Sequence, residues 1–181
     1  SKQGYKKDMI VTVAQAFKYT RIGFVRTLGG FIADTWRLRF RESLRRTQVL
    51  LGLRKDPYNI SNWLVNVQKQ VSQPFKVFYQ LGNYGEHSKN VKHSKKVFQT
   101  TIKMIADYCD VGLLISPQAI KHTSELATER KRLESIVHRP LKHMHISEFK
   151  LDVPKVYREA LEQEIQNDYT MGYPDHIGFR A

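Results

Sequence analysis

SKKVFQTTIKMIADYC, residues 94–109, carries the strongest helical periodicity of the chain. Its apolar residues recur every three or four positions, which is the spacing of one face of an α-helix. Ser94 is a residue type that caps helices at the amino end. The apolar stripe consists of Val97, Phe98, Ile102, Ile105, Tyr108 and Cys109. The segment therefore predicts an amphipathic helix that faces a hydrophobic core.

Similar but weaker patterns precede this segment. They predict helices over residues 8–28 and 31–53, a third helix from about residue 59 to Pro74, and a short helical piece over 74–81. Trp36 and Phe40 of the second helix are expected in the core. The polar, basic stretch over 82–96 is predicted to be a loop that separates two helical hairpins.

The chain after the segment also favours helices. Ser116 and Pro117 are typical of an N-cap and a first-turn proline, and the following helix is expected to end near His138, before Pro140. The LKHMHISEF stretch that follows shows no period, and a final acidic helix is expected between Asp152 and Asn167.

These patterns predict an all-α fold, an irregular bundle of five to seven amphipathic helices with an extended C-terminal tail. We expect a basic helical bundle over residues 1–150, and an acidic helix with the tail over 151–181. The 181 residues are enough for one domain. Cys109 cannot form an internal disulfide because it is the single cysteine, and we expect it to be a buried small hydrophobe. No uncharged run approaches the roughly 20 residues that span a bilayer.

The positive charge is concentrated in the first part of the chain. Residues 1–110 carry 20 basic and 7 acidic side chains, whereas residues 111–181 carry 10 of each. Such a field attracts RNA phosphates, anionic lipid headgroups or an acidic protein surface. A merely soluble basic surface is the alternative interpretation.

The RLRFRESLRR segment holds the densest cluster of charge. Arg37, Arg41 and Arg45 recur every four residues and form one stripe of the predicted helix, with Arg39 and Arg46 beside it. Guanidinium groups bind phosphates and carboxylates through paired hydrogen bonds. We therefore predict that these arginines bind a partner or an anion; a solvated helix face is the alternative.

The loop contributes a second group of candidate binding residues. Lys89, Lys92, Lys95 and Lys96 are expected to contact phosphates or headgroups without reading a sequence. Solvated loop charge explains them equally well.

Motifs for catalysis or cofactor binding are not found in the sequence. It contains no glycine-flanked serine, no phosphate-binding glycine loop and no metalloprotease histidine pair. His138, His143 and His145 cluster in sequence, but their spacing is not that of a zinc site. We therefore expect a protein that is not an enzyme and holds no cofactor or metal.

Two phrases resemble the peroxisome-proliferation (membrane-elongating) peroxin family. ESLRRTQVLLGLRK (Glu42–Lys55) is similar to a basic and apolar helical phrase of that family, and ADYCDVGLL (Ala106–Leu114) to a later one. The resemblance covers residues 8–115. It implies an amphipathic helical module that associates with anionic membrane, although the hydrophobic membrane segments of the family are missing and no single functional residue carries over.

Together these observations predict a non-catalytic accessory subunit of a large mitochondrial membrane complex, either the respiratory chain or ATP synthase. The expected location is peripheral to the inner membrane, and the expected partners are neighbouring protein subunits and anionic lipid headgroups. A start at Ser1 without a methionine favours a processed organellar protein or a trimmed chain. The alternative function is a mitochondrial ribosomal protein of the matrix that binds rRNA through its basic helices.

Overall fold

A parallel β-sheet forms the centre of the protein. The computed structural model describes residues 8–18, 36, 40–83, 90–122, 124–146 and 153–170. Within them, five strands form one sheet in the order β1-β2-β3-β4-β5, and every neighbouring pair is parallel. The strands are β1 (Ile10–Val13), β2 (Lys76–Tyr79), β3 (Asp110–Ile115), β4 (His143–Ile146) and β5 (Asn167–Asp168). The predicted all-α fold and bundle are therefore wrong, because the protein has an α/β fold.

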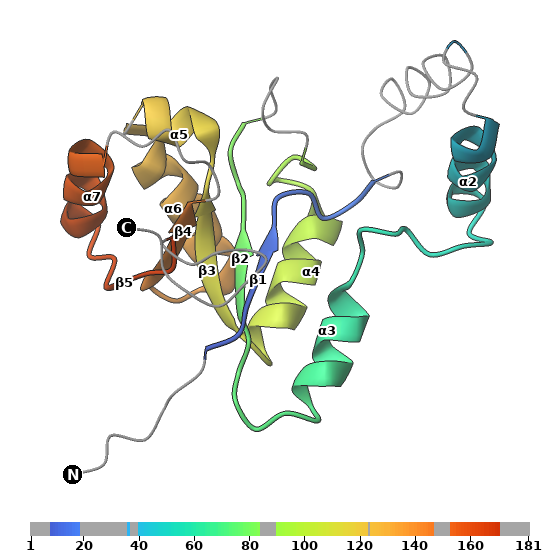
Figure 1. Ribbon diagram of the computed structural model, residues 1–181, viewed down its shortest axis with the longest axis horizontal. Helices are drawn as coiled ribbons and strands as arrows, with labels where there is room; N and C mark the ends of the chain where they lie inside the picture. Colours follow the sequence, from blue (N-terminus) through green and yellow to red (C-terminus); the bar gives the residue numbers. More distant parts are fainter. Residues whose placement is uncertain are drawn as a thin grey trace.

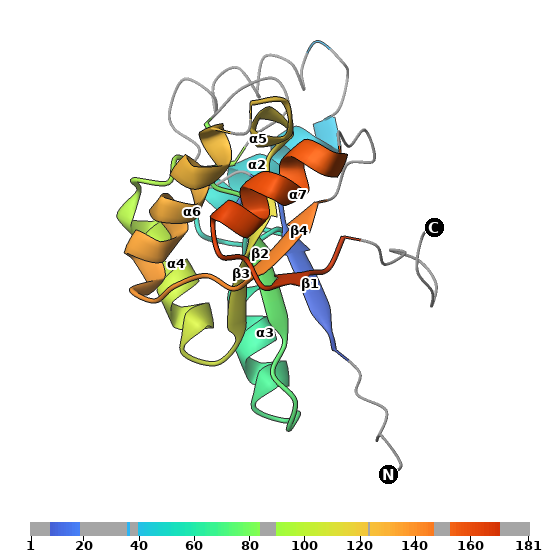
Figure 2. The same ribbon diagram turned by 90° about the vertical axis from the view of Figure 1, so that its left-hand side faces the viewer.

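Helices connect each strand to the next, as parallel neighbours require. They are α2 (Phe40–Leu50), α3 (Ser61–Gln68), α4 (Lys96–Ala106), α5 (Pro117–Lys121), α6 (Ser124–Val137) and α7 (Val153–Glu162). Helix α3 packs against α4, and α4 packs against α6. Figure 1 shows α3 and α4 beside the sheet and α2 apart from it, and Figure 2 shows α4 and α6 on the same side of β2 and β3.

The strand order explains why the helices share one face. Right-handed crossovers that always step to the next strand in the same direction place every helix on the same side of the sheet. This is the winding of β/α barrels, whereas doubly wound sheets have helices on both faces. Among the described residues, the sheet therefore has one face covered by helices and one face without them.

Alternation along the strands separates the two faces. Side chains of one parity point into the helix-covered core, where the ring of Tyr79 on β2 lies 6.1 Å from that of Phe98 on α4. The core residues contributed by the strands are Val11, Val13, Val77, Tyr79, Val111, Leu113, Ile115, Met144 and Ile146. Val156 and Ala160 of α7 belong to the same core.

The helix-free face, formed by the strand residues of the opposite parity, is polar and aromatic. It carries Lys76 and Phe78 on β2, Asp110, Gly112 and Leu114 on β3, and His143 and His145 on β4. The register places Phe78 beside Gly112. A Cβ at position 112 would lie 2.4 Å from Cε1 of Phe78, so only glycine leaves room for this ring.

Two of the predicted helices, and the stretch expected to be irregular, contain strands. The helix expected over 8–28 contains β1, the piece expected over 74–81 contains β2, and the irregular LKHMHISEF stretch contains β4. Other predictions are confirmed within the described residues. Helices α3, α4 and α7 lie inside their expected ranges, and the Ser116 hydroxyl caps α5 by accepting from the Ala119 N–H at 3.2 Å.

Two further expectations have mixed outcomes. Cys109 is buried, as predicted, and burial raises the pKa of its thiol. Trp36 is not a core residue, because 87% of it is exposed. Among the described helices, none is long and apolar enough to span a bilayer.

Candidate anion-binding site

Three arginines gather around a hollow on α2. The hollow has a volume of about 410 Å³ and is lined by Arg41, Leu44, Arg45, Gln48 and Arg54. The first four follow the i, i+3, i+4, i+7 spacing, which places them on one face of the helix. All five lining residues lie in the described part of the chain, and none is acidic. This arginine hollow (Arg41, Arg45 and Arg54) therefore concentrates three positive charges, and its described lining residues carry no carboxylate.

A glycine turn brings Arg54 back to the hollow. Gly52 adopts a φ of +75°, a left-handed conformation that glycine reaches without steric cost. The Leu53 N–H donates to the Gln48 carbonyl at 2.9 Å, and the Gly52 N–H donates to the Val49 carbonyl at 3.1 Å. This pattern ends α2 as a Schellman-like cap and reverses the chain. Arg54 was not among the predicted binding residues, although Gly52 in the sequence marks the turn.

Large apolar side chains are exposed on α2 and in the turn that follows it. Leu44 is 63% exposed, Leu51 69% and Leu53 73%. Two other residues of the helix are buried, since Val49 is 4% and Arg46 9% exposed. Figure 1 shows α2 separated from the sheet and from α4. The exposed surface of α2 is thus both basic and apolar.

The predicted binding residues have different outcomes. Arg41 and Arg45 lie together in the hollow, whereas Arg46 is buried and does not line it. Lys92, Lys95 and Lys96 are exposed in the segment before α4 and in its first turn, and they do not line the hollow. Arg37, Arg39 and Lys89 lie outside the described residues.

The helix-free face holds an ion pair. Lys76 Nζ lies 3.3 Å from Asp110 Oδ2 and 5.9 Å from the centre of the Tyr169 ring. Burial lowers the pKa of Lys76, but the hydrogen bond to Asp110 and the nearby acidic groups outweigh this effect, so the pKa is raised. The ammonium is thus charged at neutral pH and neutralises Asp110.

Two of the three clustered histidines share this face. Burial lowers the pKa of both His143 and His145. His145 Nδ1 lies 2.8 Å from the Tyr169 carbonyl oxygen, so Nδ1 carries the hydrogen and donates it. His138 ends up elsewhere, with Nε2 3.3 Å from Lys103 Nζ. The described residues include no group of three side chains able to hold a metal ion.

The carboxyl ends of the strands are where ligands bind in many parallel α/β folds. Here the buried polar groups at these ends are already hydrogen-bonded to the protein. The Asn90 carboxamide accepts from the Ala16 N–H at 3.1 Å and donates to the Gln80 carbonyl at 2.9 Å. The Glu129 carboxylate accepts from Ser116. These contacts fix the loops that leave the strands.

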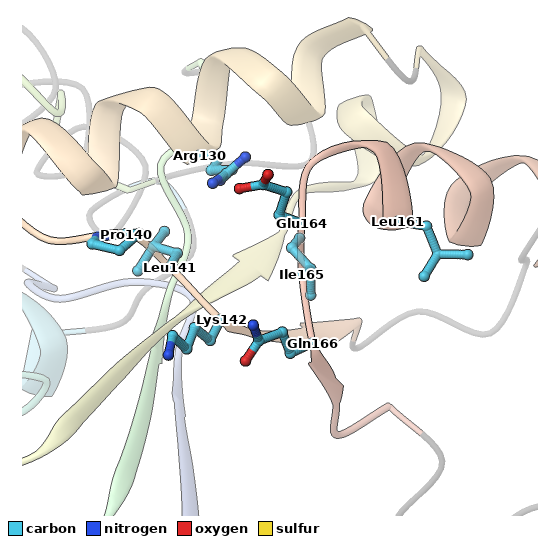
Figure 3. A pocket seen from close by; sticks show the side chains of 8 residues that line it. All are labelled: Arg130, Pro140, Leu141, Lys142, Leu161, Glu164, Ile165 and Gln166. Atoms are coloured by element: carbon cyan, nitrogen blue, oxygen red, sulfur yellow. The ribbon is translucent and has the colours of Figure 1, made fainter.

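A second hollow lies near the amino ends of β4 and β5. Its volume is about 680 Å³, and its lining is Arg130, Pro140, Leu141, Lys142, Leu161, Glu164, Ile165 and Gln166. Figure 3 shows Glu164 extended toward Arg130 and the Gln166 amide turned toward Lys142. Arg130 Nε also donates to Glu134 Oε1 at 2.9 Å. Because its charges are mixed, this hollow has no clear preference for an anion.

Comparison with known protein families, curated proteins and solved structures finds no match to this chain. The similarity of two phrases to the peroxin family stays a prediction.

Proposed function

We propose that the protein is a non-catalytic accessory subunit that attaches to an anionic partner through the arginine hollow. The setting we propose is a large membrane complex of the mitochondrion, peripheral to the inner membrane. The observation that carries the proposal is the gathering of Arg41, Arg45 and Arg54 around one hollow, in whose described lining no residue is acidic.

Electrostatics supports this role for the hollow. Like charges close together repel each other, and this cost falls when an anion lies between them. Arginine is also the side chain best suited to phosphate and carboxylate groups, because its planar donors bind two oxygens at once. A partner with several phosphates or carboxylates therefore fits the hollow.

The alternative is a mitochondrial ribosomal protein that binds rRNA through the same arginines. The leucines exposed beside the hollow argue against it, because RNA backbone contacts are polar and leave aliphatic side chains in water. An anionic partner with an apolar part accounts for both the arginines and the leucines.

The test follows the chain through gradient sedimentation of a mild-detergent mitochondrial extract, with and without ribonuclease. Wild type is compared with the triple variant Arg41→Gln, Arg45→Gln, Arg54→Gln. A control variant, Lys121→Gln, Lys131→Gln, Lys142→Gln, removes the same charge from exposed positions elsewhere. We expect co-migration with membrane-complex subunits that is lost only in the arginine variant.

Other results would contradict the proposal. Migration with ribosomal RNA that ribonuclease abolishes would favour the rRNA alternative. Equal incorporation of the arginine and lysine variants would show that the hollow does not hold the partner.

A further inference from the structure

The exposed side of α2 has two adjoining parts. Leu44 and Leu51 are seven residues apart, which is nearly two helical turns, so their side chains project from the same side of the helix. Arg41, Arg45 and Gln48 occupy the neighbouring part, where they line the hollow. An apolar strip therefore runs beside the arginines rather than opposite them.

Exposed large apolar residues are concentrated in this part of the sequence and are not scattered singly. Leu44, Leu51 and Leu53 are each more than 60% exposed, and Trp36, four residues before α2, is 87% exposed. Side chains of this kind in contact with water are unfavourable, and a cluster of them marks an interaction surface.

An anionic lipid bilayer matches both parts. Helices that lie in the headgroup region insert leucine and tryptophan toward the acyl chains while arginine binds the lipid phosphates. The described lining of the hollow has three arginines and no acidic residue, so its charge complements an anionic leaflet. An acidic protein surface would satisfy the arginines, but it would leave the leucines without an apolar environment.

We propose that α2 docks onto anionic phospholipid, with the arginine hollow on the lipid phosphates and Leu44, Leu51 and Leu53 inserted below them. This inference rests on the proposed function, because it names the partner of the same hollow. Val49 and Arg46 of α2 are buried, so docking uses only the exposed residues of the helix. No rearrangement of the described helices is required.

The test is co-sedimentation of the full chain with phosphatidylcholine vesicles, with and without added phosphatidylglycerol. We expect binding only to the anionic vesicles. Each arginine removed from the hollow should weaken vesicle binding about fivefold, which is the effect of one basic residue near an anionic surface. The lysine control variant Lys121→Gln, Lys131→Gln, Lys142→Gln, at exposed positions that the sequence did not predict to bind, should bind nearly as well as wild type.

The leucines separate insertion from charge attraction alone. Leu44→Ser with Leu51→Ser should reduce binding at least tenfold, whereas Leu161→Ser, at an equally exposed leucine of α7, should not. In a Trp63→Phe background, Trp36 is the one remaining tryptophan, and its fluorescence should shift to the blue on anionic vesicles. Circular dichroism of each variant confirms that it is folded.

The outcomes are distinguishable. Equal loss in the lysine and arginine variants, or no effect of the leucine changes, overturns the inference. If the chain fails to bind vesicles but still needs Arg41, Arg45 and Arg54 to enter the assembly, the lipid inference is wrong and the proposed function stands. Tighter binding to an RNA oligonucleotide than to vesicles, lost in the arginine variant, overturns both.

Discussion

Glu129 on α6 accepts hydrogen bonds from both the backbone N–H and the hydroxyl of Ser116, the residue at which β3 passes into α5. The N–H bond is 3.2 Å long, and Glu129 is 1% exposed. Gly82, after β2, packs so closely that a Cβ there would lie 2.9 Å from Glu129 Oε1. One carboxyl group thus ties together the chain after β2, the end of β3 and α6.

The first prediction concerns the pH dependence of this contact. Burial raises the pKa of Glu129, so the folded state binds a proton more tightly than the unfolded state does. The contribution of Glu129 to the free energy of unfolding should therefore decrease as pH rises from the unfolded-state value of about 4.5 through the raised folded pKa. Glu129→Gln keeps an acceptor for the Ser116 N–H and should remove this contribution. Urea titrations of both proteins between pH 4 and 8 measure it.

A control for that experiment is Glu129→Ala, which leaves both Ser116 groups without their acceptor. We expect it to lower the free energy of unfolding by about 2–3 kcal/mol. Parallel pH profiles for wild type and Glu129→Gln would contradict the assignment of the pH dependence to Glu129.

The second prediction concerns the close contact between Gly112 and Phe78. Gly112→Ala places a methyl group against the buried ring and should lower the free energy of unfolding by about 1–3 kcal/mol. The same change made in a Phe78→Leu background should cost less, because the colliding ring atoms are absent. Chemical denaturation of the single and double variants gives the coupling energy, and simple additivity would argue against this packing.

The third prediction concerns His145. Burial lowers its pKa, so the folded state resists protonation. Stability should therefore fall as pH drops below the unfolded-state value of about 6.5 toward the lowered folded pKa. His145→Asn keeps a donor for the Tyr169 carbonyl and removes the titration, so its loss of stability between pH 7 and 5 should be smaller. Thermal melts across this range measure it, with the exposed His122→Asn as a control that should follow wild type.

The fourth prediction concerns the ion pair of the helix-free face. Asp110→Asn should destabilise the protein by about 1 kcal/mol, because the Asp110 side chain is 46% exposed and solvent screens the pair. In Lys76→Met, Asp110 loses its partner but is still hydrated. The double variant Lys76→Met, Asp110→Asn should therefore have a free energy of unfolding no lower than that of Asp110→Asn alone. A double-mutant cycle tests the coupling, and a coupling energy near zero would mean that the pair is not formed in solution.

Strands β2 and β3 were not predicted from the sequence, and the reason is physical. Every residue of β2 is buried, and five of the six residues of β3 are. Strands inside a parallel sheet read as continuous apolar runs without alternation, and a short run of this kind cannot be told from part of a buried helix. Helix α4 was found because it is amphipathic, and α5 because Ser116 and Pro117 mark its first turn.

Part of the candidate site was predictable and part was not. The four-residue spacing of Arg41 and Arg45 placed both on one helix face, and both line the hollow. Arg54 joins them only because the chain reverses at Gly52, and the geometry of such a reversal is not contained in a periodicity. The contact between Ser116 and Glu129 joins residues 13 apart across a helix and a turn, so no local pattern indicates it.

The strictly sequential winding of the sheet also bears on how the chain folds as it is synthesised. Each strand pairs with the strand that precedes it, so β2 can join β1 as soon as the intervening helices have left the ribosome, before β4 exists. Pairings between neighbours in sequence keep the contact order low for a parallel sheet and reduce the entropy lost in closing each loop. This strand order allows the chain to add one βα unit at a time, because each completed unit offers the next strand an edge to join.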